Sequence, residues 1–310
     1  ALDISGSSCD VYTKFISHFD GIDAATSATD EIGKTITFAG NAQLDTADKK
    51  FGSASLLLDG TGDYVSLADT EDLFMDTNDF TIDFWAKFAS RTGQSNYFWH
   101  KTDASNYVQF YHSGIDDKLY FAIVVAGVNV AVYNTTAAAV ADSTTWHHIA
   151  LVRYGTNIYI FVDGVSQTLT VTTAISTNSW ANFTGTFYIG CEDGAGSFFD
   201  GWLDEFRISR GISRFTANFT PPTAAYAASS ATITSSRYWT FADWQSGRAL
   251  INTDIGLYTY TGTGSVTVVS AAPVSKFIII WKNYCIAFGL RGSPNGYRYS
   301  DISDYTTWPS

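Results

Sequence analysis

The chain has 310 residues, of which 16% are aromatic and only 15% are charged, against a typical charged fraction of about 25%. This composition excludes an intrinsically disordered chain, a collagen and a coiled coil. The net charge of −12 is uneven: residues 1–229 carry 12 Lys and Arg against 26 Asp and Glu, whereas residues 230–310 carry 6 against 4. The acidic body disfavours nucleic acid as a partner, since phosphate binding needs clustered Lys and Arg.

Neither a membrane span nor a cysteine framework is predicted. A membrane helix needs roughly 18 apolar residues, and the longest candidate, Phe121–Val132, is shorter and contains Asn129. The first residues lack a basic region followed by an apolar stretch, so no signal peptide is visible; the alternative is that one has already been removed, since the sequence starts at Ala1 and its only methionine is Met75. Three widely spaced cysteines, Cys9, Cys191 and Cys285, predict neither a disulfide set nor a zinc site.

Alternation of apolar and polar residues recurs along the first two-thirds of the chain. In Phe80–Phe88 the residues Phe80, Ile82, Phe84, Ala86 and Phe88 share one face, which predicts a half-buried strand. Further strands are predicted at Ser55–Asp59, Tyr64–Leu67, Tyr107–His112, Leu119–Ala126, His147–Arg153, Asn157–Asp163, Phe187–Cys191 and Trp202–Ser209. Asp-Gly pairs between such runs are hairpin signals. The pattern predicts an all-β sandwich, barrel or jelly roll.

The composition changes near residue 220. The stretch Thr220–Thr232 is small, uncharged and contains two prolines, and we place a linker at 223–232. Shorter strands are predicted beyond it, at Arg248–Ile251, Leu257–Thr261, Val266–Ser270, Lys276–Trp281 and Tyr284–Gly289. The predicted organisation is therefore an N-terminal arm (1–14), a large β domain (15–222), the linker, and a small β-rich module (233–310).

Six phrases in the large domain carry a family likeness. They are HFDG (18–21), KFGSASLLLDGTGDYVSL (50–67), DFTIDFWAKF (79–88), WHHIALVRYGTNIYIFVDG (146–164), FYIGC (187–191) and GWLDEFRISRGISRF (201–215). Their order and spacing resemble the laminin-G-like, concanavalin A-like lectin/glucanase jelly-roll family. The resemblance implies two curved antiparallel sheets packed face to face, often a structural calcium, and usually binding rather than catalysis. Because fold does not determine function, it settles only the architecture.

The C-terminal part carries a second likeness. KFIIIWKNYCIAFG (276–289) and SPNGYRYSDISDYTTW (293–308) look like segments of phage tail and virion structural proteins. The resemblance implies attachment to a virus particle or to sister subunits. The segments look like blades of a β-propeller in those proteins. The likeness covers about 60 residues, and a closed propeller needs several blades.

Asp204 is the most informative carboxylate. Alternation places it with Trp202, Phe206 and Ile208 on the face expected to be buried, where a carboxylate needs a cation or several donors. The family resemblance implies calcium held between Asp204 and Asp20, with carbonyls and water completing a shell of six to eight oxygens. An arginine partner for Asp204, and a turn-capping role for Asp20, are the alternatives.

Catalytic signals are weak. Asp204 and Glu205 superficially resemble the carboxylates of glucanases with this fold, but adjacent strand residues point to opposite faces. Retaining hydrolysis needs both carboxyls about 5 Å apart on one side of the sugar. No nucleophile elbow, phosphate loop or dinucleotide fingerprint is present. We therefore expect a protein that is not an enzyme.

Aromatic residues cluster in the stretch around Tyr97–Tyr111, which we expect to form loops. Rings beside hydrogen-bonding groups suit a shallow glycan site, whereas packing in an aromatic core is the alternative. The candidate glycan-binding residues are Tyr97, Trp99, Asp103, Asn106, Tyr107 and Tyr111.

The resulting hypothesis is a non-enzymatic bacteriophage virion structural protein, either a capsid decoration or a tail-associated component. We expect it on the virion surface after assembly in the host cytoplasm, with other virion proteins as partners. Its jelly roll is expected to adhere to cell-surface or environmental polysaccharide, and a homo-oligomer, with a trimer as one form, is expected. The alternative is a secreted or surface carbohydrate-binding module, which would be extracellular. A polysaccharide-cleaving enzyme is the third hypothesis.

Overall fold

The computed structural model describes residue 10, residues 12–226, and the strand segments 239–244, 248–253, 256–260, 267–268, 277–281, 284–290 and 293–299. The chain divides into two units, Ala1–Ala228 and Ser229–Ser310. Almost every described element is a strand; η1 (Glu71–Leu73), a single 3-10 turn, is the only helical element among them. The all-β prediction is therefore confirmed. None of the described helical residues forms a span that could cross a membrane.

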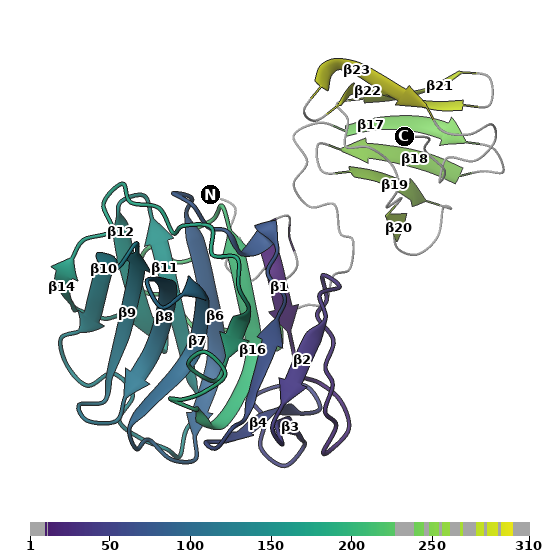
Figure 1. Ribbon diagram of the computed structural model, residues 1–310. Helices are drawn as coiled ribbons and strands as arrows, with labels where there is room; N and C mark the ends of the chain where they lie inside the picture. Colours follow the sequence, from purple (N-terminus) through teal and green to yellow (C-terminus); the bar gives the residue numbers. More distant parts are fainter. Residues whose placement is uncertain are drawn as a thin grey trace. The chain divides into compact units, whose positions relative to one another are not determined.

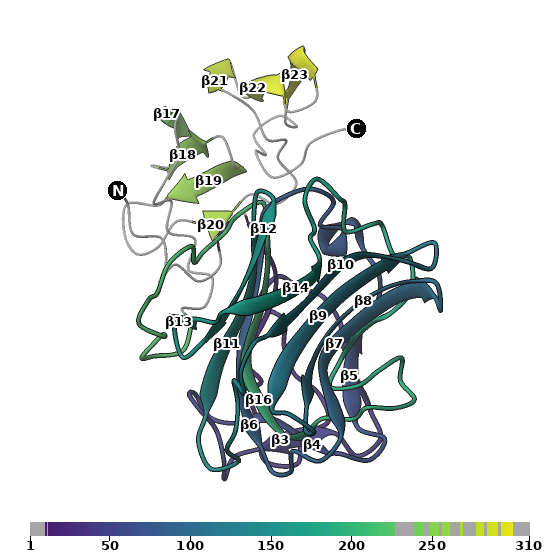
Figure 2. The ribbon, with the colours of Figure 1, turned by 90° about the vertical axis from the view of Figure 1, so that its left-hand side faces the viewer.

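The first unit is a sandwich of two antiparallel sheets (Figures 1 and 2). The first sheet has the order β13-β12-β11-β6-β16-β4-β3, with β1 also paired to β16. Its strands are β1 (Thr13–Ser17), β3 (Gln43–Asp45), β4 (Ser55–Asp59), β6 (Phe80–Phe88), β11 (His147–Tyr154), β12 (Asn157–Val162), β13 (Val165–Ser166) and β16 (Asp200–Arg210).

The second sheet has the order β14-β10-β9-β8-β7-β15-β5-β2. Its strands are β2 (Ile36–Ala39), β5 (Tyr64–Leu67), β7 (Gln94–Asp103), β8 (Asn106–Ser113), β9 (Lys118–Val125), β10 (Val128–Thr135), β14 (Leu169–Thr173) and β15 (Phe187–Ile189). The region around Tyr97–Tyr111, which we expected to form loops, is instead the β7–β8 hairpin, with only residues 104–105 outside the strands.

The core lies between the two sheets and follows the alternation of the sequence. Phe80, Ile82, Phe84, Ala86 and Phe88 of β6 all lie in it, as predicted. The second sheet contributes alternate residues such as Phe98, Phe110 and Phe121. The other face of β6 is also covered, since Thr81 and Asp83 are fully buried.

A β-bulge in β16 corrects one prediction. Asp204 pairs with Trp85 and Arg207 with Asp83, so β16 has an extra residue at this point, and Glu205 has a φ of 53°. Leu203 before the bulge and Phe206 and Ile208 after it point into the core, whereas Trp202 and Asp204 point to the outer face of the first sheet. Asp204 therefore does not share a face with Phe206 and Ile208, because the bulge shifts the alternation.

The segment 211–226, here called the strap, crosses the outer face of the first sheet. Phe215 and Phe219 stack on each other, with ring centroids 3.7 Å apart, and pack on Val152 and Phe161. The N–H of Phe219 donates to the carbonyl of Gly164 at 2.9 Å. Of the predicted linker, 223–232, residues 223–225 are exposed and Tyr226 is buried; its residues 227–232 lie outside the described part of the chain, as do residues 1–9 and 11 of the predicted arm.

The described strands of the second unit form two small antiparallel sheets, of four and three strands. Their strands are β17 (Trp239–Trp244), β18 (Arg248–Thr253), β19 (Gly256–Tyr260), β20 (Thr267–Val268), β21 (Phe277–Trp281), β22 (Tyr284–Leu290) and β23 (Ser293–Tyr299). The five predicted strands correspond to β18–β22, whereas β17 and β23 were not predicted. Residues 300–308 of the virion-like phrase lie outside the described residues.

Candidate functional site

Six aromatic side chains gather on the outer face of the second sheet. Core residues such as Phe98 and Phe110 point inward, so the residues that alternate with them point outward. Register brings the outward residues together across the strands: Trp99 lies opposite Tyr188, and Tyr111 lies opposite Tyr120. We call this set the aromatic face; its members are Tyr64, Trp99, Tyr107, Tyr111, Tyr120 and Tyr188.

The rings of the aromatic face form three pairs. Trp99 and Tyr107 are stacked, with centroids 4.5 Å apart and planes 12° apart. Tyr111 and Tyr120 are stacked at 5.0 Å and 6°. Tyr64 meets Tyr188 edge to face at 5.5 Å. Trp99 is only 6% exposed, and the five tyrosines are half-buried, so the tyrosines present the accessible ring surface.

Polar groups border the rings. The Tyr120 hydroxyl donates to Asp116 Oδ2 at 2.8 Å, and Lys118 pairs with the same carboxylate. Burial, and then the hydrogen bond to Asp116, raises the pKa of Tyr120 to about 12. Burial also raises the pKa of Tyr107, and the charge of Glu192 raises it further. Both hydroxyls therefore stay protonated near neutral pH; the Tyr120 hydroxyl donates its proton to Asp116, whereas the Tyr107 hydroxyl can donate to a ligand.

A turn after β15 supplies the acidic edge of the aromatic face. Its Gly194, with φ of 69°, approaches the rings so closely that an added Cβ would lie 3.2 Å from Tyr188. Glu192 in this turn accepts a hydrogen bond from the Ser197 hydroxyl at 2.8 Å, and Asp193 forms an ion pair with Lys101. The indole Nε1 of Trp99 is buried and has no hydrogen-bond partner.

Three predicted glycan-binding residues lie on the aromatic face, and three do not. Trp99, Tyr107 and Tyr111 lie together on it. Tyr97 is fully buried in the core against Phe84, because β7 has a register shift between Asn96 and Phe98. The proposal that Tyr97 contacts glycan is therefore corrected.

The other two, Asp103 and Asn106, close the β7–β8 turn. The Asn106 amide donates to both oxygens of Asp103, at 3.0 and 3.1 Å. Their polar groups satisfy each other and the turn backbone, so they shape the hairpin that carries Trp99 and Tyr107.

Tyr64, Tyr120, Tyr188 and Glu192 were not predicted as site residues. Tyr64 and Tyr188 come from strands more than 120 residues apart in the sequence, and strand register alone joins them. Tyr120 had a usable signal, since it alternates with buried Leu119 and Phe121 in a predicted strand.

The two predicted calcium ligands bind one loop rather than each other. Asp204 is buried, and its Oδ2 accepts the N–H groups of Lys50 at 2.8 Å and Phe51 at 3.0 Å. Asp20 is exposed and accepts hydrogen bonds from Ser53 and from the N–H of Ala54. Asp204 Oδ1 is buried without a partner, which suits a cation, but the described residues contain no group of three or more acidic, His or Cys side chains that could hold a metal.

Asp204 should make stability depend on pH in the absence of calcium. Burial, opposed by hydrogen bonds and strengthened by the charge of Glu205, raises the pKa of Asp204 to about 8. The folded state therefore retains a proton that the unfolded chain releases near pH 4. The contribution of this group is fully present below pH 4 and is lost as the pH rises to about 8, by up to about 1.4 kcal/mol per unit.

The test is a series of melts in chelator from pH 4 to pH 9 for the wild type and Asp204→Asn. The asparagine oxygen can still accept the amides of Lys50 and Phe51 but does not titrate, so the advantage of the wild type should shrink as the pH rises. If the melting temperatures of the wild type and of Asp204→Asn instead ran parallel from pH 4 to pH 9, Asp204 would be ionised in the folded state over this whole range.

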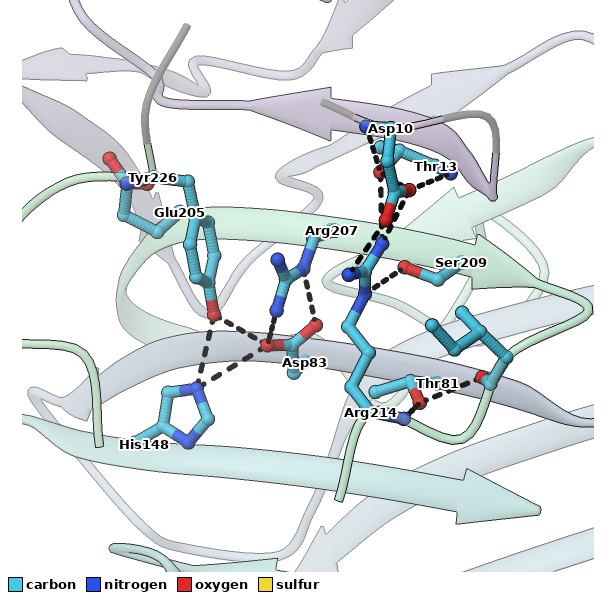
Figure 3. Close-up of polar contacts among 11 residues, drawn as sticks. Asp10, Thr13, Thr81, Asp83, His148, Glu205, Arg207, Ser209, Arg214 and Tyr226 are labelled. Carbon is cyan, nitrogen blue, oxygen red and sulfur yellow. Dashed lines mark hydrogen bonds and ion pairs between the residues drawn. The ribbon is translucent and has the colours of Figure 1, made fainter. Parts of the chain in front are cut away.

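A second polar cluster lies under the strap, on the outer face of the first sheet (Figure 3). Arg207 donates to Asp83 from Nε at 2.9 Å and from Nη2 at 2.7 Å, and both side chains are fully buried. The Tyr226 hydroxyl donates to Asp83 Oδ2 and lies 3.2 Å from His148 Nε2. The N–H of Tyr226 donates to Glu205 Oε2 at 2.7 Å.

The same outer face holds a further arginine. Arg214 of the strap donates to Ser209 and to both oxygens of Asp10, and its own N–H donates to Thr81. Because Tyr226 and Arg214 of the strap make hydrogen bonds here to residues of β6, β11 and β16, we interpret this cluster as the fastening of the strap. It is too deeply buried to receive a ligand.

Comparison with known proteins places the fold. The family model of the concanavalin A-like lectin/glucanases superfamily (laminin G type) matches residues 59–213, half of the chain. A comparison with curated proteins found no match. Among solved structures, the chain is similar to the binding domain of botulinum neurotoxin serotype G, with 11% identity, 94% of this chain and 74% of that one covered, and a TM-score of 0.51.

Two further structures show weaker similarity. Domain 4 of AbnA, a GH43 extracellular arabinanase from Geobacillus stearothermophilus solved with arabinotriose, has 18% identity, 65% and 93% coverage, and a TM-score of 0.49. The CBM40 of the Ruminococcus gnavus IT-sialidase bound to α2,3-sialyllactose has 15% identity, 44% and 77% coverage, and a TM-score of 0.37. At these identities the similarity concerns the fold alone.

Proposed function

The protein belongs to the concanavalin A-like lectin/glucanase superfamily, and from this premise we propose that it binds polysaccharide through the aromatic face without cleaving it. The observation that carries the proposal is the set of three ring pairs on one sheet, in which the five tyrosines are half-buried. Sugar rings present flat apolar faces edged by hydroxyls, which suit an aromatic surface bordered by hydrogen-bonding groups. The hydroxyls of Tyr107 and Tyr111 and the carboxylate of Glu192 provide such groups.

Binding without cleavage is favoured by the placement of the carboxylates. Asp204 and Glu205, which resemble a catalytic pair in sequence, are buried on the outer side of the first sheet. Glu205 is held by His18 Nδ1 at 2.8 Å and by the N–H of Tyr226. At the aromatic face, Asp193 and Asp116 are engaged with Lys101 and Lys118. A glycosidase needs two carboxyls across one scissile bond.

The acidic surroundings favour neutral glycans. Glu192, Asp193 and Asp116 border the aromatic face, against two lysines. Residues 1–229 carry a net charge of −14. This negative charge would repel anionic polymers that contain uronate or sialate. We expect retention on neutral polysaccharides to exceed retention on anionic ones, and the gap to narrow with added salt.

The experiment is affinity electrophoresis of the full chain against bacterial and algal polysaccharides, with an assay for released reducing ends. Tyr107→Ala and Tyr111→Ala should each weaken binding roughly tenfold, about 1.4 kcal/mol, because each removes a stacking ring. Tyr154→Ala is the matched control, since Tyr154 is exposed at the end of β11 in the other sheet. Retardation unaffected by both face variants would refute this site, and released reducing ends would refute a non-enzymatic role.

The biological setting of this activity is a virion. We propose a capsid decoration or tail-associated protein, located on the virion surface, which contacts other virion proteins. The support is the likeness of residues 276–308 to phage structural proteins. Immunogold labelling of purified virus particles tests the proposal, since a virion surface protein should carry the label on the particles. Label confined to the culture fluid would favour the alternative, a secreted carbohydrate-binding module.

Calcium is proposed as a structural ion near Asp204. The unpartnered Asp204 Oδ1 supports this proposal. Asp20 instead accepts hydrogen bonds from Ser53 and from the N–H of Ala54. Bound calcium would hold Asp204 ionised and stabilise the fold by mass action. A thermal melt with and without chelator, joined to elemental analysis, decides the matter: an unchanged midpoint with no metal found refutes it.

A further inference from the structure

One polar side chain lies in the middle of the aromatic face. Gln109 alternates on β8 with Val108 and Phe110, which point into the core, so its own side chain points outward. Tyr107 and Tyr111 stand two positions before and after it on the same strand and the same face. The amide of Gln109 is therefore flanked by two of the rings that we propose to contact sugar.

Across the sheet, Gln109 lies between a large side chain and a small one. Trp99 of β7 is its partner on one side, and Ala122 of β9 is its partner on the other. Tyr120, two positions before Ala122, stacks on Tyr111, whereas Ala122 itself presents only a methyl group. Gln109 is half-buried, so part of its side chain is in contact with solvent among the rings.

The fold does not use the amide of Gln109. Within the part of the chain that the structure describes, no hydrogen bond joins this side chain to another group. Even the indole Nε1 of Trp99, its neighbour across the strands, has no partner, so the Gln109 oxygen does not accept from it. At the border of the face, by contrast, Asp116 is already engaged by Tyr120. The donor and the acceptor of Gln109 are therefore available to a ligand.

We propose that Gln109 determines which polysaccharide the aromatic face accepts, by recognising two adjacent free hydroxyls of a neutral sugar. Its carbonyl oxygen accepts a hydrogen bond from one hydroxyl, and its NH₂ group donates to the next. The rings hold a sugar by its apolar face and do not distinguish one hydroxyl pattern from another. The role rests on the proposed polysaccharide binding and adds the chemical pattern that the ligand must carry.

Gln109→Met tests this role, because methionine keeps the length of the side chain and removes both hydrogen-bonding groups. The midpoint of thermal unfolding should not change, since the fold does not use the amide. The affinity for polysaccharide should fall roughly tenfold, the effect of one or two hydrogen bonds. Affinity electrophoresis of the full chain measures it with dextran, galactomannan and laminarin, each native and O-methylated. Tyr154→Ala again serves as the control.

The preference for native over methylated polysaccharide gives a readout that a structural role would not change. A methylated hydroxyl has no proton to donate to the Gln109 oxygen, so the wild type should bind the native form roughly tenfold more tightly. In Gln109→Met this ratio should shrink at least roughly threefold. In Tyr107→Ala both affinities should fall and the ratio should stay, because the Tyr107 ring stacks on either form and its hydroxyl can donate to either form.

The outcomes separate the two proposals. Weaker binding and a smaller ratio in Gln109→Met, at an unchanged unfolding midpoint, support the role of Gln109. An unchanged ratio, or a lowered midpoint that accounts for the weaker binding, overturns it. If Tyr107→Ala weakens binding and Gln109→Met does not, the polysaccharide site stands and the role of Gln109 fails. If none of the three polysaccharides retards the wild type, both proposals fail.

Discussion

Replacing Asp83 with alanine is expected to lower the free energy of unfolding by about 3–5 kcal/mol. Asp83 and Arg207 are both fully buried and joined by two hydrogen bonds, so the variant would leave the guanidinium charge inside the protein without its partner. Burial alone would raise the pKa of Asp83, but the charge of Arg207 holds it well below its usual range. The Tyr226 hydroxyl would lose its acceptor as well.

Chemical denaturation of the full chain measures this effect. The matched control is Asp72→Ala, which breaks the ion pair of Asp72 with Lys34 at the surface and should cost less than about 1 kcal/mol. A double variant, Asp83→Leu with Arg207→Met, should recover much of the loss, since a buried pair replaced by apolar groups is often near neutral. Equal losses in Asp83→Ala and Asp72→Ala would show that the buried pair is not formed.

Arg153→Met is expected to destabilise the fold by about 3 kcal/mol or more. Arg153 is 1% exposed, and its guanidinium donates to the carbonyls of Gly155, Asp76, Asn178 and Ser176 at 2.9–3.3 Å. It thereby ties the segment before β6 to the segment after β14. Methionine fills part of the volume but leaves four carbonyls without this donor.

Denaturation is again the measurement, with hydrogen exchange of residues 175–180 as the local readout, since these amides should open first. Arg91→Met is the control, because Arg91 pairs with Asp117 at the partly exposed surface. A loss below about 1 kcal/mol in Arg153→Met would mean that water replaces the guanidinium at the carbonyls.

The sequence was sufficient for the fold where alternation is uninterrupted. β6 reads as a strand because its apolar residues recur at every second position, and they do line the core. Alternation fails at a bulge, which inserts a residue without changing the composition. Asp204 was placed on the wrong face for this reason, since the bulge at Glu205 moves the register. Tyr97 was expected in a loop, but it lies in β7, where the shift after Asn96 turns it into the core.

The candidate site was predictable only in its local part. Trp99, Tyr107 and Tyr111 lie within one hairpin, so the sequence already gathers them. Tyr188 and Tyr64 join them through the pairing of β15 with β7 and β5, which no local pattern encodes. Only the end of the strap, from residue 220 on, was interpreted as linker-like, because its prolines and small residues are typical of a linker. Its fastening depends on contacts between Tyr226 and residues as far away in sequence as Asp83.

The fastening of the strap bears on how the first unit withstands tension. Tyr226 is held to Glu205 of β16, to Asp83 of β6 and to His148 of β11. A pull applied through residue 227 would therefore load three central strands together instead of peeling one strand from an edge. Such an attachment resists force by shearing several hydrogen bonds at once.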